Sequence, residues 1–306
     1  MTNSEKFIGA MLCAGNRLSS GRAYLDSLNV FPVPDSDTGT NLCRTFKAAC
    51  DAVRHNEAFT VNELLEKASK AMLRNARGNS GVILSALFKG FSDRMKLFGE
   101  FSCDGLFEAF DKAVQNACRV LSRPILKGTI LSIAVACRDE LSRANFSSCE
   151  EAFSLLVPVS NAALKKTEEE LEEAKNAGVV DSGAAGLTLI IEGIDSFLSQ
   201  KGSANSFSEN VVFKKQAASP ALSFAYCTEA IILKKGFFPV SQLEKSLEQL
   251  GDCVIVAPDG EIVKFHLHTN LPGRALSVAM KFGDLTDIKI DNMVLQAEKN
   301  ERTAKT

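Results

Sequence analysis

Apolar residues recur every three or four positions through roughly the first 200 residues, the spacing that places them on one face of a helix. Gly and Pro residues interrupt this pattern between segments. We count eight helical segments, at about residues 3–28, 39–55, 61–75, 80–97, 104–121, 129–144, 149–175 and 182–198. The pattern therefore predicts an all-helical first domain.

The pattern changes after a small, polar stretch at residues 201–219, which has the composition of a linker. Segments then follow in the order strand, helix, strand, strand, helix, strand. This order predicts a small split-βαβ, ferredoxin-like sandwich with its helices on one face. The predicted fold class is multidomain, α plus α+β, with domains at 1–200 and 220–292 and a tail at 293–306.

Composition excludes several classes of protein. A length of 306 residues suits two domains, and 45% hydrophobic with 24% charged residues is ordinary for a globular protein. The formal charge of −2 and the lack of a basic stripe argue against nucleic acid as a partner. Nine Cys without a CxxC pair indicate reduced thiols. With no apolar run near the ~20 residues of a transmembrane helix, we expect a cytoplasmic protein.

Asp35 and Asp37 lie two residues apart, directly before the second helical segment. Carboxylates so placed suit Mg²⁺, as one shared ion or two, and Asn29 could supply another oxygen. The N–H groups of the following helix would suit an anion. The alternative is a polar loop that caps the helix, and the pair alone does not decide between them. The order Asp-x-Asp-x-Gly-x-Asn favours the metal.

Three more Gly-containing junctions, at 76–81, 127–129 and 178–186, precede the fourth, sixth and eighth segments. Backbone N–H groups there could hold phosphate, and Arg77 could neutralise charge in phosphoryl transfer. Each junction alone is weak evidence for a phosphate site, and for residues 76–81 alone an ordinary interhelical turn is the favoured interpretation. Asp181 could cap a helix, or reach a ribose or a metal-bound water. Because alternate helices of an up-and-down array start at the same end, we expect the four junctions to form one rim.

His266 and His268 lie two residues apart in a predicted strand, so their side chains face the same side. With the thiolate of Cys227 they would make a three-ligand set with an open fourth position, which suits Zn²⁺. The alternative is a strand with two surface histidines and a buried cysteine. The His-x-His spacing alone favours that alternative.

The segments LNVFPVPDSDTGTN, ARGNSGVILS, KGTILS and AGVVDSGAAGL resemble the DhaL-type nucleotide-binding domain of dihydroxyacetone kinases. LNVFPVPD is closer still to the bacterial fatty-acid kinase ATP-binding subunit. The resemblance covers about residues 1–200 and implies an eight-helix up-and-down barrel that binds Mg-ATP at one end, with Asp35 and Asp37 as metal ligands. The residues expected at the nucleotide are Thr38, Gly39, Thr40, Asn41, Gly78, Asn79, Ser80, Gly81, Thr129, Asp181 and Gly183.

Three positions depart from the family pattern. Dihydroxyacetone kinases carry a third Asp upstream of the pair, where Asn29 is the nearest polar residue here. Ser36 stands where the family usually has Gly, and Lys127 stands where an acidic residue is expected. Neither of these last two removes a proposed metal ligand, and the identity of the third ligand stays open.

The fatty-acid kinase family carries a Cys and a His-x-His in its middle domain, implicated in activity and proposed to bind a metal. Cys227, His266 and His268 match them. The resemblance therefore favours a metal site over the alternative of a strand with two surface histidines and a buried cysteine. With Arg77, these three are the residues for which we expect a catalytic role.

The resemblance implies transfer of the γ-phosphoryl group of ATP to a fatty-acyl carboxylate held by a separate lipid-binding protein, in phospholipid synthesis. One alternative is a dihydroxyacetone (glycerone)-type kinase, and another is a nucleotide-binding adaptor without turnover. Members of the fatty-acid kinase family have a further carboxy-terminal domain that this sequence does not match. We expect a separate polypeptide in its place or a shorter family branch, and a homodimer is left open.

Overall fold

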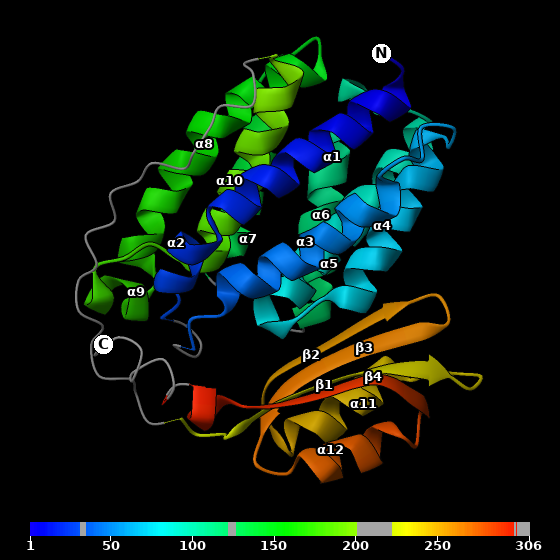
Figure 1. The fold of residues 1–306 in the computed structure, drawn as a ribbon, viewed down its shortest axis with the longest axis vertical. Helices are drawn as coiled ribbons and strands as arrows, with labels where there is room; N and C mark the ends of the chain where they lie inside the picture. Colours follow the sequence, from blue (N-terminus) through cyan, green and yellow to red (C-terminus); the bar gives the residue numbers. More distant parts are fainter. Residues whose placement is uncertain (31–34, 122–126, 201–221, 297, 299–306) are drawn as a thin grey trace. The chain divides into compact units, whose positions relative to one another are not determined.

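The computed structural model describes residues 1–30, 35–121, 127–200, 222–296 and 298, and the chain divides into two compact units, one helical and one with a sheet (Figure 1). The helices of the first unit are α1 (Asn3–Ser20), α2 (Arg22–Ser27), α3 (Thr38–Val53), α4 (Val61–Asn75), α5 (Gly78–Met95), α6 (Leu106–Leu121), α7 (Ile130–Leu141), α8 (Cys149–Glu170), α9 (Glu172–Ala177) and α10 (Ser182–Leu198). Two short 3₁₀ turns, at Lys96–Phe98 and Cys103–Gly105, lie between α5 and α6.

Local sequence signals set where the helices begin. At α4, the Thr60 hydroxyl accepts the backbone N–H of Glu63, while the Glu63 carboxylate accepts the N–H of Thr60 at 2.8 Å. The same reciprocal cap, between Thr2 and Glu5, begins α1. Each cap satisfies N–H groups that a helix start otherwise leaves without partners.

The prediction of eight helical segments was wrong in two places, and the described chain has ten α-helices in this unit. The first segment breaks at Gly21, where a Cβ would lie 2.5 Å from Leu189 Cδ1 of α10. The seventh breaks at Leu171, which adopts an extended backbone (φ −106°, ψ 119°). The Leu171 side chain is buried, although the glutamates before and after it in the sequence are exposed. In both places tertiary packing overrides a continuous helical pattern.

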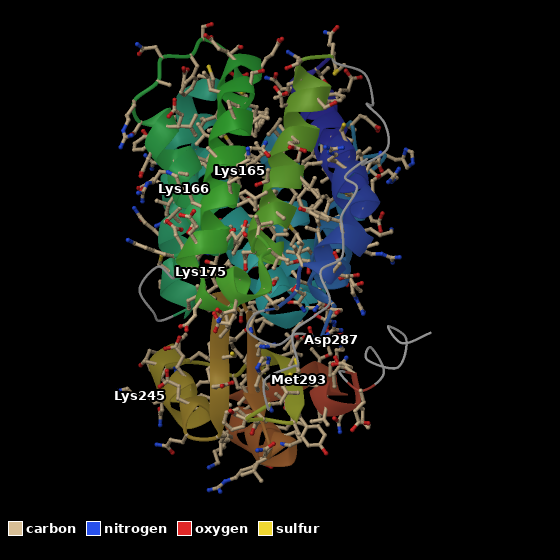
Figure 2. All side chains as sticks on the ribbon, turned by 90° about the vertical axis from the view of Figure 1, so that its left-hand side faces the viewer. Lys165, Lys166, Lys175, Lys245, Asp287 and Met293 are labelled. Carbon is tan, nitrogen blue, oxygen red and sulfur yellow. The ribbon has the colours of Figure 1, made fainter. Side chains whose placement is uncertain are left out.

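The helical core depends on close approach between helices. α1 and α10 lie against each other, and a Cβ on Gly193 would lie 2.5 Å from Ala14 Cα. A partly open pocket of about 100 Å³ in this unit is lined only by apolar residues, Phe46 and Phe91 among them. On the outer surface, Lys165 and Lys166 of α8 extend into solvent (Figure 2). No helix in the described ranges combines the length and apolarity needed to cross a membrane.

The second unit is a four-stranded antiparallel sheet with two helices, in the predicted order. Its elements are β1 (Tyr226–Lys234), α11 (Val240–Glu248), β2 (Gly251–Asp259), β3 (Ile262–Thr269), α12 (Pro272–Ala279) and β4 (Gly283–Asn292). The strand order is β2-β3-β1-β4, so β3 lies between β1 and β2, the two strands that α11 connects. The predicted linker at 201–219 lies outside the described residues.

The two faces of this sheet have different roles. Both helices lie on one face (Figure 1), where alternate residues such as Ile232, Val263 and Phe265 form an apolar core with them. The residues between these point to the opposite face, which carries the predicted histidines. Packing continues past Asn292, because Met293 is buried and its N–H donates to the Ala225 carbonyl.

Candidate functional site

The loop before α3 presents Asp35 and Asp37 as half-buried carboxylates. Asp37 occupies the N-cap position of α3, yet its side chain makes no capping hydrogen bond. Instead, its Oδ1 accepts a hydrogen bond from Asn41 Nδ2 at 2.8 Å. A carboxylate fixed by a side chain one helical turn later is oriented without being used as a cap, which favours the metal interpretation over the capping one.

Ser36 separates the two carboxylates and has φ +56°, in the left-handed region. That region favours Gly, because a Cβ there costs about 1–2 kcal/mol. A Gly at this position, which the family usually has, would adopt this conformation without that cost, and this chain holds the turn with a strained serine.

Two side chains brace the start of α3 from the preceding segment. Asn29 is buried, and its Oδ1 accepts the Thr38 hydroxyl at 2.9 Å. Asp26, which the sequence did not single out, accepts both the N–H and the hydroxyl of exposed Thr40, at 2.8 and 2.9 Å. Burial raises the pKa of Asp26. Asn29 thus orients Thr38 in the structure, and its role as a metal ligand stays a prediction.

The first turns of α3 and α5 lie close together, at positions where α5 has glycine residues. Gly78 has φ +60°, and a Cβ on it would lie 2.7 Å from Asn41 Nδ2. A Cβ on Gly81 would lie 2.5 Å from the Thr45 hydroxyl. At both positions an added Cβ would force a side chain of α3 to move, so the close approach of α5 to α3 favours glycine, in addition to any ligand.

The starts of α5, α7 and α10 meet at Gly183. A Cβ there would lie 3.2 Å from Asp181 Oδ2, 3.5 Å from Ile130 Cβ and 3.9 Å from Ser80 Oγ. Together with the Gly78 contacts, this brings the four predicted junctions to one end of the helical unit. The sequence argument for a common rim is supported by this geometry.

Asp181 is buried and caps α10, with its Oδ2 accepting the N–H of Ala184 at 2.7 Å. Burial raises the pKa of its carboxyl to about 6, although hydrogen bonds from backbone N–H groups oppose the shift. Of the alternatives drawn from the sequence, the structure shows the cap. Contact with a nucleotide stays a prediction.

The remaining predicted residues take ordinary positions at the helix starts. Arg77 is the N-cap residue of α5, and its backbone N–H donates to the Thr45 hydroxyl at 3.4 Å. Half-buried Asn79 follows in the first turn of α5. Thr129 is the N-cap residue of α7, and Lys127 before it is exposed.

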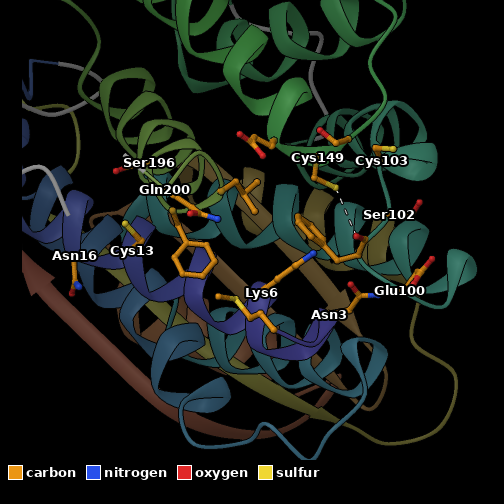
Figure 3. A pocket seen from close by; sticks show the side chains of 16 residues that line it. Asn3, Lys6, Cys13, Asn16, Glu100, Ser102, Cys103, Cys149, Ser196 and Gln200 are labelled. Carbon is orange, nitrogen blue, oxygen red and sulfur yellow. Dashed lines mark hydrogen bonds between the residues drawn. The ribbon is translucent and has the colours of Figure 1, made fainter. Parts of the chain in front are cut away.

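A larger hollow of about 760 Å³ lies elsewhere on the helical unit (Figure 3). Polar residues of α1, such as Lys6 and Asn16, and Ser196 near the end of α10 contribute to its wall. The described residues that line it include none of the predicted site residues. We therefore place the candidate site by the convergence of helix starts and carboxylates, and not by the size of a hollow.

On the sheet, the structure brings Cys227, His266 and His268 together. Cys227 pairs with His268 across β1 and β3, and one ligand atom from each of the three lies within 4.8 Å of the others. The two imidazole centroids are 5.1 Å apart. Burial, and then the neighbouring His266, lowers the pKa of His268 to about 3, so this imidazole is neutral and can donate a lone pair to a metal.

The sequence did not indicate a second set of possible ligands, Asp252, Cys253 and His268, which also converge within 4.8 Å. The register of β2 against β3 shifts between Asp252 and Ile255, and Cys253 there has φ +51°. This β-bulge inserts one extra residue into β2. A bulge has no signature in the alternation of residues, so the sequence pattern could not reveal it.

Comparison with known proteins gives two family matches. Residues 32–196 match the family model of the DAK2 domain, which is just over half of the chain. Residues 223–300 match the model of the FakA-like middle domain of fatty acid kinases. The first match lies in the helical unit and begins after α2, and the second lies in the sheet unit.

Among curated relatives, uncharacterised proteins of Staphylococcus aureus strains MRSA252 and USA300 are each 32% identical over 321 aligned positions. Each alignment covers 99% of this chain and 58% of the relative, so the chain spans little more than half their length. The crystal structure of C. freundii dihydroxyacetone kinase in complex with AMP-PNP and Mg²⁺ superposes with a TM-score of 0.50 at 14% identity. It covers 62% of this chain and 33% of the kinase, and at this identity it shows a shared fold.

Proposed function

Because the chain belongs to the DAK2 domain family, we propose that it is the nucleotide-binding part of an ATP- and Mg²⁺-dependent phosphotransferase. The observation that carries the proposal is the meeting of four helix starts, those of α3, α5, α7 and α10, at one end of the helical unit. A helix N-terminus presents unpaired N–H groups and partial positive charge. Four of them near two carboxylates suit a polyphosphate with its metal.

The residues present fit Mg²⁺. Asp35 and Asp37 offer hard oxygen ligands. The hydrogen bond from Asn41 orients the Asp37 carboxylate, which does not cap the backbone N–H groups of α3. The ion would neutralise negative charge on the β- and γ-phosphates. Ser80 and the backbone of the α5 start would contact the phosphates, and Arg77 would supply further positive charge. The AMP-PNP and Mg²⁺ bound by the C. freundii kinase, which shares the fold, support this assignment.

For the acceptor, we propose the carboxylate of a fatty acid presented by a separate lipid-binding protein, giving an acyl phosphate. The match of residues 223–300 to the FakA-like middle domain of fatty acid kinases supports this choice. We assign Cys227, His266 and His268 to a second cation site, because a thiolate with two imidazoles suits zinc-like cations. The fit is supported by Nε2 of His266, which is buried and has no hydrogen-bond partner among the described residues.

The first experiment measures ATP binding with and without Mg²⁺ by calorimetry. Asp35→Ala and Asp37→Ala should each abolish the Mg²⁺-dependent part of the affinity. Asp51→Ala is the matched control, since Asp51 lies on the surface of α3 and pairs with exposed Lys47. If both site variants keep the wild-type affinity, the assignment of the nucleotide site is wrong.

The second experiment tests the acceptor. Purified chain, ATP and fatty-acid-loaded binding proteins from the same genome are incubated with hydroxylamine, which traps an acyl phosphate as a hydroxamate. His268→Ala should reduce hydroxamate formation and leave ATP affinity unchanged. Phosphorylation of dihydroxyacetone in place of fatty acid would favour the triose kinase alternative, and ATP binding without any transfer would favour an adaptor.

A further inference from the structure

The face of the sheet opposite α11 and α12 carries two charged residues that the proposed cation site does not use. Glu229 of β1 pairs directly opposite His266 of β3, and Lys264 is two residues before His266 on the same strand. Alternation places both on the face that carries Cys227 and His268. Glu229 and Lys264 are both fully buried, which is rare for these residue types unless they are paired.

Glu229 contacts Nδ1 of His266. The other ring nitrogen, Nε2, is the one without a hydrogen-bond partner among the described residues. Its Oε1 lies 3.1 Å from Nδ1 of His266, and the two side chains are 1% and 0% exposed. A carboxylate can only accept, so this contact places the imidazole proton on Nδ1. Cys227 Sγ lies 3.6 Å from the same nitrogen, a longer contact to a weaker acceptor. Nε2 then carries the lone pair, and it is the atom without a partner among the described residues.

Lys264 provides the opposite charge that Glu229 needs. Its Nζ lies 3.8 Å from Glu229 Oε2, and the Lys264 side chain is 0% exposed. An isolated buried carboxylate is costly, and a nearby ammonium offsets part of that cost. A buried ion pair of this kind adds little net stability compared with apolar residues, so folding stability alone does not account for its presence.

We propose that Glu229, held in place by Lys264, is a positioning residue that fixes the Nδ1–H tautomer of His266 and so presents Nε2 to a divalent cation bound with Cys227 and His268. The proposal rests on the assignment of the second cation site above. Histidines that bind metals usually donate their other ring N–H to a carboxylate or carbonyl, and loss of that partner typically weakens metal binding 10- to 100-fold. Glu229 itself lies outside the set of converging ligand atoms.

The test is a titration of the full chain with Co²⁺, whose absorption reports thiolate ligation and coordination number. Wild type should bind Co²⁺ with a thiolate-to-cobalt band from Cys227. Glu229→Gln should bind it 10- to 100-fold more weakly with the same visible spectrum. Glu261→Gln, an exposed residue of the β2–β3 turn, is the matched control and should match wild type.

A second variant guards against misfolding. Glu229→Gln alone leaves the Lys264 ammonium buried without its carboxylate, so the double variant with Lys264→Met removes both charges. The double variant should fold, as judged by circular dichroism, and should keep the weakened Co²⁺ affinity. Recovery of wild-type affinity in the double variant would overturn the proposal, because Glu229 would then only neutralise Lys264.

A direct readout of the tautomer completes the test. Long-range ¹H–¹⁵N spectra of the metal-free chain should show His266 protonated at Nδ1 in wild type. That preference should be weakened in Glu229→Gln, because a neutral amide oxygen is a poorer acceptor than a carboxylate. Unchanged Co²⁺ affinity in Glu229→Gln, no Co²⁺ bound by wild type, or a changed visible spectrum that makes Glu229 a ligand would each overturn the proposal. ATP affinity, measured in parallel, shows separately whether the nucleotide site assignment fails.

Discussion

The candidate site of the helical unit depends largely on backbone groups, whereas that of the sheet unit depends on side chains. At the helix starts, backbone N–H groups and close glycine contacts form the site, and Gly78 and Gly183 matter because they lack a Cβ. On the sheet, side chains at alternate positions of two strands form it, and His266 and Glu229 matter because of the atoms they carry. The glycine contacts of the first site should fail when atoms are added. Its two carboxylates, like the side chains of the second site, should fail when atoms are removed.

The largest effect expected in the helical unit is on its response to pH, through Asp181. Its pKa is raised from 3.8 to about 6 in the folded state, so the folded chain binds the proton more tightly than the unfolded chain. The resulting stabilisation is fully present below about pH 4 and is lost as the pH rises through 6. The shift corresponds to about 3 kcal/mol.

Urea unfolding at pH 4 and pH 7 checks this expectation in wild type and in Asp181→Asn. Asparagine keeps an oxygen that can cap α10 and does not titrate. The wild type should lose stability relative to the variant between the two pH values. An equal pH dependence in both proteins would show that Asp181 does not carry the effect.

The next effect tests whether the rim depends on glycine contacts. Gly78→Ala and Gly99→Ala both place a Cβ on a residue with positive φ, +60° and +75°, so they share the backbone penalty. Only at Gly78 would the Cβ meet a neighbour, Asn41 Nδ2 at 2.7 Å, while no described atom lies within 4 Å at Gly99. Gly78→Ala should weaken Mg-ATP binding about 10- to 100-fold.

Gly99→Ala should bind Mg-ATP as wild type does, and neither variant should change Co²⁺ binding by the sheet cluster. Calorimetry with each ligand gives both readouts. Equal ATP affinities for the two variants would mean that the α3–α5 contact is not part of the nucleotide site.

The smallest effect concerns Ser36, in the turn between the two carboxylates. Ser36→Gly relieves the left-handed backbone at φ +56° but adds chain entropy to the unfolded state. The net gain in unfolding free energy should be about 0.5–1 kcal/mol, measured by urea unfolding, with ATP affinity unchanged or improved. A loss of stability would show that the serine hydroxyl makes a contact worth more than the strain.

Much of the fold could be predicted from the sequence, because hydrophobic periodicity reports which face of each element is buried. The order of elements in both units follows from it. The breaks at Gly21 and Leu171 could not, because they depend on neighbours distant in sequence. Gly21 lies against Leu189 of α10, and Leu171 leaves the helical conformation to bury its side chain.

The candidate sites were predictable to the extent that their residues stand in recognisable spacings. Asp35 and Asp37 precede a helix, and His266 and His268 alternate on a strand. The residues that orient them have no such spacing. Glu229 lies 37 residues from the imidazole it contacts, a partner that only the pairing of β1 with β3 reveals.

The bulge at Cys253 has a consequence for insertions and deletions in β2. Because side chains alternate, removing one residue from a regular strand moves every later side chain to the opposite face. Cys253 is the extra residue of the bulge, since Asp252 pairs with His268 and Ile255 with His266. Its deletion would leave Val254 opposite Leu267 and both flanking pairs in register. Within the bulge, β2 can therefore shorten by one residue without inverting its faces, and what it would lose is the thiol beside His268.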